Sequence, residues 1–122
     1  MRIALTAHGK DFAAAIDSRF GRADYFVIYD QEKDSWDCLS NEQNLEAAHG
    51  AGIQAGQNLL KTGAEVLITG HVGPKAFKVL DAGKVKMYSF GDMNGTVEEV
   101  LTAFLDGKLT PIVAANAVEV KR

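Results

Sequence analysis

From residue 51 onwards, short apolar segments alternate with amphipathic helical segments, and this alternation limits the fold more than any other feature of the chain. Strands that are joined through a helix pair in parallel, cross over with a right hand, and form a sheet that is covered on both faces. The sequence therefore predicts a layered α/β fold. The predicted segments are a helix over 51–62, a strand over 65–69, a helix from 74, a strand over 85–88 and a helix from 96.

Glycines and a capping pattern mark the ends of these helices. Gly63, Gly83 and Gly107 stand where a helix-ending glycine belongs. Thr96 and Glu99 have the spacing of a capping box, in which each side chain binds the backbone N–H of the other residue. These signals set the boundaries of the helices.

Three strands are predicted before the first helix. Residues 2–6 form a short apolar strand, and residues 25–29 form a strong aromatic and β-branched strand. Residues 35–39 follow a polar turn and pair with residues 25–29 as a hairpin. Residues 10–24 are predicted to be irregular.

The complete order is three strands, then helix, strand, helix, strand, helix. The simplest sheet puts the first strand at the centre, the hairpin on one side and the two later strands on the other, in the order 3-2-1-4-5. We predict a three-layer α/β/α sandwich of the ribonuclease H-like type, with a five-stranded mixed sheet. One domain spans residues 1–109, and residues 110–122 form a ragged C-terminal tail.

Composition excludes several classes of protein. The 122 residues carry a formal net charge of -3, which gives no basic surface for nucleic acid. No apolar run approaches the roughly 20 residues of a membrane span, and we expect a cytoplasmic protein. The single cysteine, Cys38, cannot form an internal disulfide or supply the four-cysteine set of most iron–sulfur clusters. We expect Cys38 to be buried on the same strand face as Trp36.

In this topology the carboxyl ends of four strands and the amino ends of three helices meet at one edge of the sheet. All three histidines fall there, because His8 follows the first strand and His49 and His71 precede the first two helices. The first and fourth strands are neighbours that lead away in opposite directions. A crevice between residues 7–9 and 70–71 is therefore the switch point where open α/β sheets bind ligands.

Such an edge favours the capture of an anion. Glycine lets a backbone approach a ligand closely, and each helix start contributes about 0.3–1 kcal/mol toward an anion through its unpaired N–H groups. We expect the three helix starts to act together. Arg19 and Arg22 are candidate cations beside them, Phe20 is expected to be a core residue, and Asp17 and Asp24 are interpreted as turn or capping acids.

Other chemistries fit the sequence less well. Residues 50–55 match the dinucleotide pattern G-x-G-x-x-A, but no predicted strand precedes them. A phosphate-binding loop needs Gly-Lys-Ser or Gly-Lys-Thr, which Pro74-Lys75 does not provide. A nuclease of this fold needs a carboxylate in the first strand, which has none. No general acid–base pair is evident, so we do not expect an enzyme.

Four motifs follow one another along the chain and together carry a family resemblance. They are Arg19-Phe20-Gly21-Arg22-Ala23 before a Tyr-Phe strand, Asn44 followed by His49-Gly50-Ala51-Gly52, the run 63–70 with Gly73-Pro74 and Ala76-Phe77, and Gly95-Thr96-Val97-Glu98-Glu99. With these motifs the chain, from Met1 to about Leu109, resembles the dinitrogenase iron-molybdenum cofactor biosynthesis family.

The resemblance implies a carrier rather than an enzyme. Members of that family are ribonuclease H-like single domains, and the better-understood ones carry iron–sulfur or molybdenum-containing clusters, or their precursors, between assembly proteins. Small stand-alone members include ones that hold a molybdenum–copper sulfide cluster, so the resemblance does not fix the cargo. It implies an anionic metal–sulfur cluster that is held without cysteines, by backbone N–H groups, arginines and a histidine.

The resemblance also implies which residues bind the cluster. His49 is in addition the candidate metal ligand, although some relatives have only glycine at that position. The cluster-binding residues that the resemblance implies first are Arg22, His49, Gly50, Ala51 and Gly52, and second Gly70, His71, Val72 and Gly73. Arg19 is added to them as a candidate because of its charge.

Two functions from different classes remain. The first is a non-catalytic carrier or storage protein for an anionic metal–sulfur cluster, which works with cofactor-assembly or acceptor proteins. The alternative is a regulatory or adaptor module that binds a small anionic metabolite or a protein partner at the same edge. A coloured protein with bound molybdenum, iron or copper would support the first, and a colourless protein with a bound metabolite the second. The sequence leaves open whether His8 and His71 bind a ligand or only close their loops.

Overall fold

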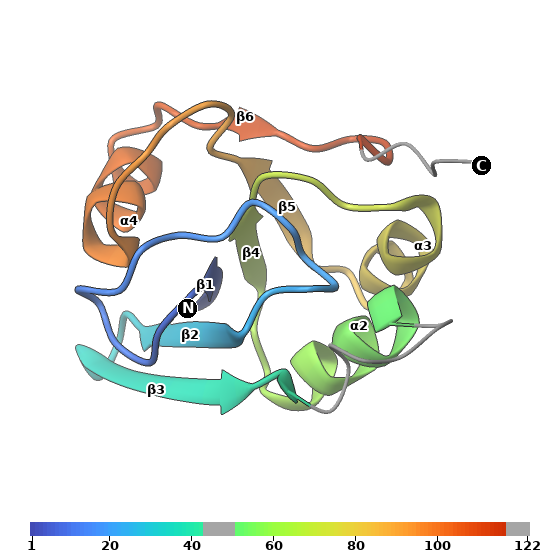
Figure 1. The fold of residues 1–122 in the computed structure, drawn as a ribbon, viewed down its shortest axis with the longest axis horizontal. Helices are drawn as coiled ribbons and strands as arrows, with labels where there is room; N and C mark the ends of the chain where they lie inside the picture. Colours follow the sequence, from blue (N-terminus) through green and yellow to red (C-terminus); the bar gives the residue numbers. More distant parts are fainter. Residues whose placement is uncertain (43–50, 117–122) are drawn as a thin grey trace.

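The computed structural model describes residues 1–42 and 51–116 of the chain. Within these residues, six strands form one open mixed sheet in the order β3-β2-β1-β4-β5-β6, and helices pack against it. The strands are β1 (Arg2–Ala7), β2 (Tyr25–Asp30), β3 (Ser35–Ser40), β4 (Val66–Thr69), β5 (Lys86–Ser89) and β6 (Thr110–Pro111), and the helices, labelled as in Figure 1, are α2 (Ala51–Lys61), α3 (Pro74–Ala82) and α4 (Val97–Leu105).

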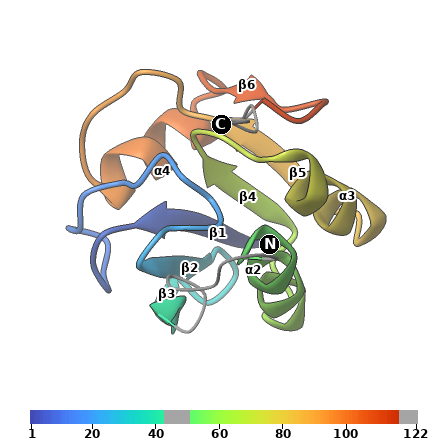
Figure 2. The same cartoon turned by 45° about the vertical axis from the view of Figure 1, so that its right-hand side comes forward.

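Helices cover both faces of the sheet. Figures 1 and 2 show α2 and α3 on one face and α4 on the other. Successive residues of β1 point to opposite faces. Ala4 joins Leu59 of α2 and Leu80 of α3 in one apolar core, whereas Ile3 and Leu5 join the apolar side of α4 in a second core. The predicted three-layer α/β/α sandwich is confirmed.

The strand directions gather several ends at one edge. β1 is parallel to β4 and β4 is parallel to β5, whereas β2 is antiparallel to both β1 and β3. β1, β3, β4 and β5 therefore end at the same edge, which we call the carboxyl edge, and α3 and α4 begin there because they follow β4 and β5. The predicted strand order 3-2-1-4-5 is confirmed.

The C-terminal segment differs from the prediction. Residues 110–111 pair with residues 88–89 as the sixth strand. The N–H of Ile112 donates to the carbonyl oxygen of Met87 over 2.8 Å, and the side chain of Ile112 is buried. Residues 110–112 are therefore attached to the sheet rather than ragged. A two-residue strand that contains a proline has no readable periodicity, which is why the sequence did not predict it.

The glycines at the helix ends act in two ways. Gly63 and Gly107 have φ angles of 76° and 73°, in the left-handed region that glycine adopts easily. Gly83 has a φ of -81°, and the left-handed residue is Lys84. A Cβ at Gly83 would lie 2.3 Å from Leu60 in α2, so this glycine allows α2 and α3 to pack closely. Within residues 1–42 and 51–116, no helix has the length and apolar character of a membrane span.

Cys38 is exposed, so the expectation that it is buried was wrong. It shares a strand face with Trp36, but only Trp36 is covered, by the rings of Tyr29 and Phe12 at centroid distances of 4.7 and 5.6 Å. β3 is the edge strand, whereas α4 packs on β1, two strands away. The strand period predicts which face a residue occupies, but it does not predict how far the covering layer extends.

Candidate functional site

A cleft of about 430 Å³ opens at the carboxyl edge. His8 and His71 line it from the ends of β1 and β4, and Asp17 and Arg19 line it from the long connection between β1 and β2. Asp92 contributes from the loop before α4. The cleft lies at the switch point that the sequence predicts, and it brings together Arg19 and two of the three histidines.

Buried threonines attach the β1–β2 connection to the sheet. The hydroxyl groups of Thr6 and Thr69, at the ends of β1 and β4, lie 2.8 Å apart, and both residues are fully buried. The Thr6 hydroxyl also donates to the carbonyl oxygen of Asp17, and the N–H of Asp17 donates to the carbonyl oxygen of Thr6 over 2.9 Å. Asp17 is therefore held in a fixed position beside both strand ends.

The carboxylate of Asp17 organises the charged side chains of the cleft. It is 2% exposed, and it accepts hydrogen bonds from the N–H, Nε and Nη2 of Arg19 at 3.0, 3.1 and 3.0 Å. These hydrogen bonds, together with the negative charges of Asp17 and Asp24, raise the pKa of the Arg19 guanidinium against the effect of burial. The Nδ1 of His8 lies 3.5 Å from Asp17 and 3.4 Å from Asp24.

The cleft itself is not electropositive when its histidines are neutral. The positive charge of Arg19 faces the paired carboxylate of Asp17, and Asp92 adds a second negative charge among the residues that line the cleft. Arg19 therefore supports the loop more than it attracts an anion. An anion needs positive potential from other groups at this edge.

The start of α4 does not supply that potential, so the expectation that three helix starts act together was wrong. The N–H groups of Val97 and Glu98 donate to the carbonyl oxygens of Ala14 and Phe12, both over 2.9 Å. The N–H of Glu99 donates to the hydroxyl of its capping-box partner. The β1–β2 connection runs across the carboxyl edge and occupies these donors, which leaves the starts of α2 and α3.

The first turns of α2 and α3 touch each other. A Cβ at Gly52 in α2 would lie 3.1 Å from the Cβ of Ala76 in α3, and a Cβ at Gly21 would lie 3.2 Å from the backbone of Gly52. Small residues thus let two helix starts and the β1–β2 connection meet at one point. We call Gly21, Arg22, Gly52, Gly73 and Ala76 the helix-start corner.

This corner concentrates positive potential. α2 and α3 begin beside each other, so the partial positive charges of their first turns act on the same space. Arg22, next to Gly21, is exposed and carries a positive charge. His49 and Gly50 come immediately before α2 in the chain and lie outside the described residues.

The backbone groups of the loop after β4 bind to other segments of the chain, and these bonds hold the loop in place. Gly70 is buried, and a Cβ there would lie 2.7 Å from the Cβ of Ser18. The N–H of His71 donates to the carbonyl oxygen of Ser18, and the N–H of Val72 donates to Oδ1 of Asn116, both over 2.7 Å. Val72 is fully buried. Gly70 and Val72 therefore serve the fold, whereas the side chain of His71 is exposed to the cleft.

Gly73 differs from the other glycines of the described residues. It is the N-cap of α3, with a φ of -74° and no side-chain hydrogen bond to the helix. A Cβ at this position would meet no atom within 4 Å, and Gly73 is the one described glycine with neither a positive φ nor such a neighbour. The space in front of α3 is therefore open to a ligand.

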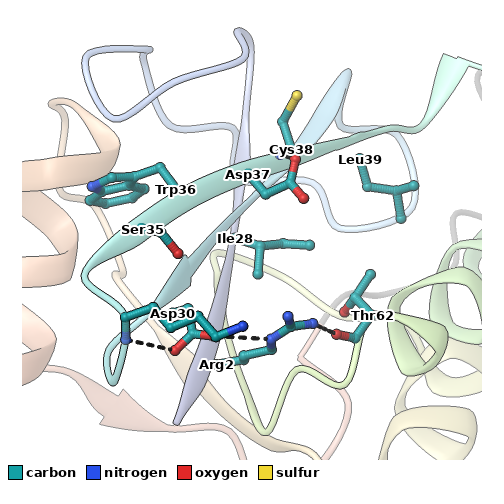
Figure 3. Close-up of a pocket in the computed structure, with 10 residues that line it drawn as sticks. Arg2, Ile28, Asp30, Ser35, Trp36, Asp37, Cys38, Leu39 and Thr62 are labelled. Atoms are coloured by element: carbon teal, nitrogen blue, oxygen red, sulfur yellow. Dashed lines mark hydrogen bonds and ion pairs between the residues drawn. The ribbon is translucent and has the colours of Figure 1, made fainter.

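A second pocket of about 310 Å³ lies beside β3 and does not belong to this site (Figure 3). Arg2 donates there to the carboxylate of Asp30 over 3.4 Å and to the carbonyl oxygen of Thr62. In Figure 3 the sulfur of Cys38 points away from Arg2 and Thr62. The pocket shares no lining residue with the cleft, so Cys38 lies apart from the candidate site.

The structure brings some predicted residues together and gives others a structural role. His71 and Arg19 meet in the cleft, Arg22, Gly52 and Gly73 belong to the corner, and Ala51 is buried at the start of α2. The described residues contain no group of three or more His, Cys, Asp or Glu side chains that could hold a metal ion. The interpretation of Asp17 as a turn acid is confirmed, because its carboxylate accepts from the N–H of Arg19 two residues further on. Sequence reasoning missed the ion pair of Asp17 with the Arg19 side chain, for which the Asp-x-Arg spacing was a usable signal. It also missed Asn116, which no local signal marks.

Comparison with known proteins identifies the family. The profile of the family described as dinitrogenase iron-molybdenum cofactor matches residues 1–107. An uncharacterized protein of Methanocaldococcus jannaschii is 25% identical over a match of length 99 that covers 77% of this chain and 80% of that protein.

Two solved structures are similar over almost the whole chain. The apo form of the orange protein from Desulfovibrio gigas is 40% identical, with a TM-score of 0.89, and the match covers 95% of this chain and 96% of that one. A Thermotoga protein provisionally named NifB is 38% identical, with a TM-score of 0.83 and coverage of 95% and 97%. The chain therefore belongs to the dinitrogenase iron-molybdenum cofactor family.

Proposed function

We propose that this protein binds and carries an anionic metal–sulfur cluster at the helix-start corner and catalyses no reaction. The cargo is an iron–molybdenum–sulfur precursor or a molybdenum–copper sulfide cluster. The observation that carries the proposal is the pair of touching helix starts with open space at Gly73. Membership of a family described by the iron-molybdenum cofactor supports the choice of cargo.

The corner suits a cluster that is recognised whole, by its negative charge. The sulfide atoms at the surface of such a cluster accept hydrogen bonds from the backbone N–H groups of helix starts, as phosphate oxygens do at other helix starts. Arg22 contributes a charged donor, and His49 is the proposed metal ligand. No cysteine is required, and Cys38 lies in a different pocket.

The position of the corner also suits transfer of the cargo. Arg22 and Pro74, the first residue of α3, are exposed, so a bound cluster would lie at the surface of the molecule. A cluster in that position can pass to a second protein without unfolding of the carrier. We therefore propose that the partners are cofactor-assembly or acceptor proteins.

Gly73→Ser tests the proposal directly. Serine fills the open space and gives α3 the side-chain cap that it lacks, so stability should be unchanged or higher by about a few tenths of a kcal/mol. Cluster binding should fall, because the hydroxyl occupies the N–H groups that the cluster would use. Apoprotein is mixed with thiomolybdate and copper without oxygen, and the bound metal and visible absorption are measured after gel filtration.

Two substitutions that each remove one positive charge provide a matched comparison. Arg22→Gln should lower cluster retention, whereas Lys33→Gln in the β2–β3 turn removes the same charge and should retain the cluster like the wild type. The proposal fails if the wild type retains no cluster, or if Gly73→Ser and Arg22→Gln both retain it unchanged. A colourless protein that carries a small anionic metabolite would support the regulatory alternative instead.

A further inference from the structure

The C-terminal segment reaches the candidate site although it comes from the far end of the chain. After β6 it passes Ile112, which is buried against the core on the α2–α3 side of the sheet, and continues to Asn116 (Figure 1). The segment thus crosses the edge of the sheet beyond β5. The family profile ends at residue 107, so Asn116 lies beyond the matched region.

Asn116 makes three hydrogen bonds to one short loop. Its Oδ1 accepts from the N–H of Val72 over 2.7 Å, its Nδ2 donates to the carbonyl oxygen of Gly70 over 3.0 Å, and its own N–H donates to the carbonyl oxygen of Val72 over 3.0 Å. The side-chain amide presents its oxygen to a donor and its nitrogen to an acceptor, the one orientation that satisfies both.

The same loop carries two elements of the candidate site. His71 lies between the two residues that Asn116 holds, and Gly73 is the next residue after Val72. Other segments also hold this loop, because Ser18 accepts from the N–H of His71 and Ser89 donates to the carbonyl oxygen of Gly70 over 3.1 Å. Asn116 adds the bonds to Val72 and a second donor to Gly70.

We propose that Asn116 is a positioning residue for the cluster site: by holding residues 70–72 it sets the position of the His71 side chain and of the Gly73 N-cap. This inference rests on the proposed function, since the site it positions is the proposed cluster site. Asn116 itself does not contact the cluster. Its loss should leave the fold intact and loosen the loop.

The first arm of the test measures the loop without any cluster. In Asn116→Ala the amide hydrogen of Val72 loses its acceptor, so its exchange with solvent should become roughly five- to tenfold faster. The amide of Ile68, inside β4, should exchange at the wild-type rate, which shows that the fold is intact. Val113→Ala changes an exposed residue of the same segment and should leave both amides unchanged.

The second arm measures the cluster that is assembled from thiomolybdate and copper. Asn116→Ala should release it several-fold faster than the wild type and change the visible circular dichroism of the bound cluster, because the groups around it shift. Val113→Ala should match the wild type in both measurements. A merely structural role would lower the folded fraction without changing the spectrum of the cluster that remains bound.

The outcomes separate this inference from the proposed function. Faster exchange at Val72 together with faster release and a changed spectrum supports the role of Asn116. Unchanged exchange at Val72, or faster exchange with wild-type release and spectrum, overturns it while the proposed function stands. If the wild type itself retains no cluster, the proposed function fails and the positioning role falls with it.

Discussion

Asp17 shows how much of the candidate site depends on one side chain. Its carboxylate is almost fully buried, accepts three hydrogen bonds from Arg19 and lies beside His8. A buried carboxylate is stable only when such partners are present. Asp17 therefore fixes the shape of the β1–β2 connection, which in turn carries Gly21 and Arg22 to the helix-start corner.

Asp17→Asn should destabilise the protein. The amide keeps one acceptor but loses the negative charge that Arg19 binds, and the loss of charged hydrogen bonds costs about 1–3 kcal/mol. Urea unfolding monitored by far-UV circular dichroism measures this change. The control, Asp24→Asn, alters a carboxylate that is 43% exposed and should cost less than about 1 kcal/mol. Equal losses in the two variants would contradict the role assigned to Asp17.

Single residues also show the limit of sequence reasoning. Burial of Phe20 was expected and is confirmed. In a run of charged residues and glycine, the large aromatic side chain is the one that gains most from leaving water. Glycine at position 70 reflects contact with Ser18, which lies in a distant part of the chain. The sequence shows that such a glycine is unusual, but only the path of the chain shows what approaches it.

At the scale of elements, the β1–β2 connection and α4 form one unit. The connection supplies carbonyl groups to the first N–H groups of α4, and Ala15 pairs with Thr96 as an isolated bridge. The capping box was predictable, because its two residues lie three positions apart. The carbonyl groups from the connection were not predictable, because an irregular segment gives no periodic signal of its path.

Thr96→Ala tests the contribution of the capping box. The Thr96 hydroxyl accepts from the N–H of Glu99, and the Glu99 carboxylate accepts from the N–H of Thr96 over 3.0 Å. Loss of the hydroxyl should lower the free energy of unfolding by about 1 kcal/mol, as measured by thermal and urea unfolding. Thr102→Ala makes the same change in the middle of α4 and should be neutral or slightly stabilising. A neutral Thr96→Ala would show that the connection alone caps α4.

At the scale of the whole molecule, the sequence was sufficient for the order of the first five strands but not for β6. The apolar runs of β1 and β4 and the amphipathic helices show which faces are buried, and the handedness of crossovers leaves few arrangements. The site was less predictable, because its groups are positioned by contacts between loops. The positions of Asn116 and of the buried Ile112 were not predictable for this reason, since their partners are more than 20 residues away in the sequence.

The stability of the molecule should fall in acid partly through Asp30. Desolvation acts to raise the pKa of this carboxylate, but hydrogen bonds from the N–H groups of Lys33 and Glu32 and from Arg2 outweigh it, so the pKa lies below its usual value. The stabilisation is therefore complete above the unfolded pKa of about 4 and is lost as the pH falls through the lower folded pKa.

Urea unfolding midpoints at neutral pH and across the range from about pH 4 to pH 2 measure this effect. Asp30→Asn should be less stable than the wild type at neutral pH, and the difference should shrink as the pH falls through that range. A difference that stays constant with pH would show that the charge of Asp30 does not contribute.

The two edge strands of the sheet, β3 and β6, affect how copies of the protein can pair with one another. β6 is only two residues long and includes Pro111, which has no N–H to offer, and on β3 the N–H of Cys38 is already bound by the carboxylate of Asp37 over 2.8 Å. An edge strand with unpaired N–H and C=O groups can pair with a strand of another chain, which leads to aggregation. Pro111 and the Asp37 carboxylate each remove one backbone donor from an edge strand, which disfavours edge-to-edge pairing between copies of the protein.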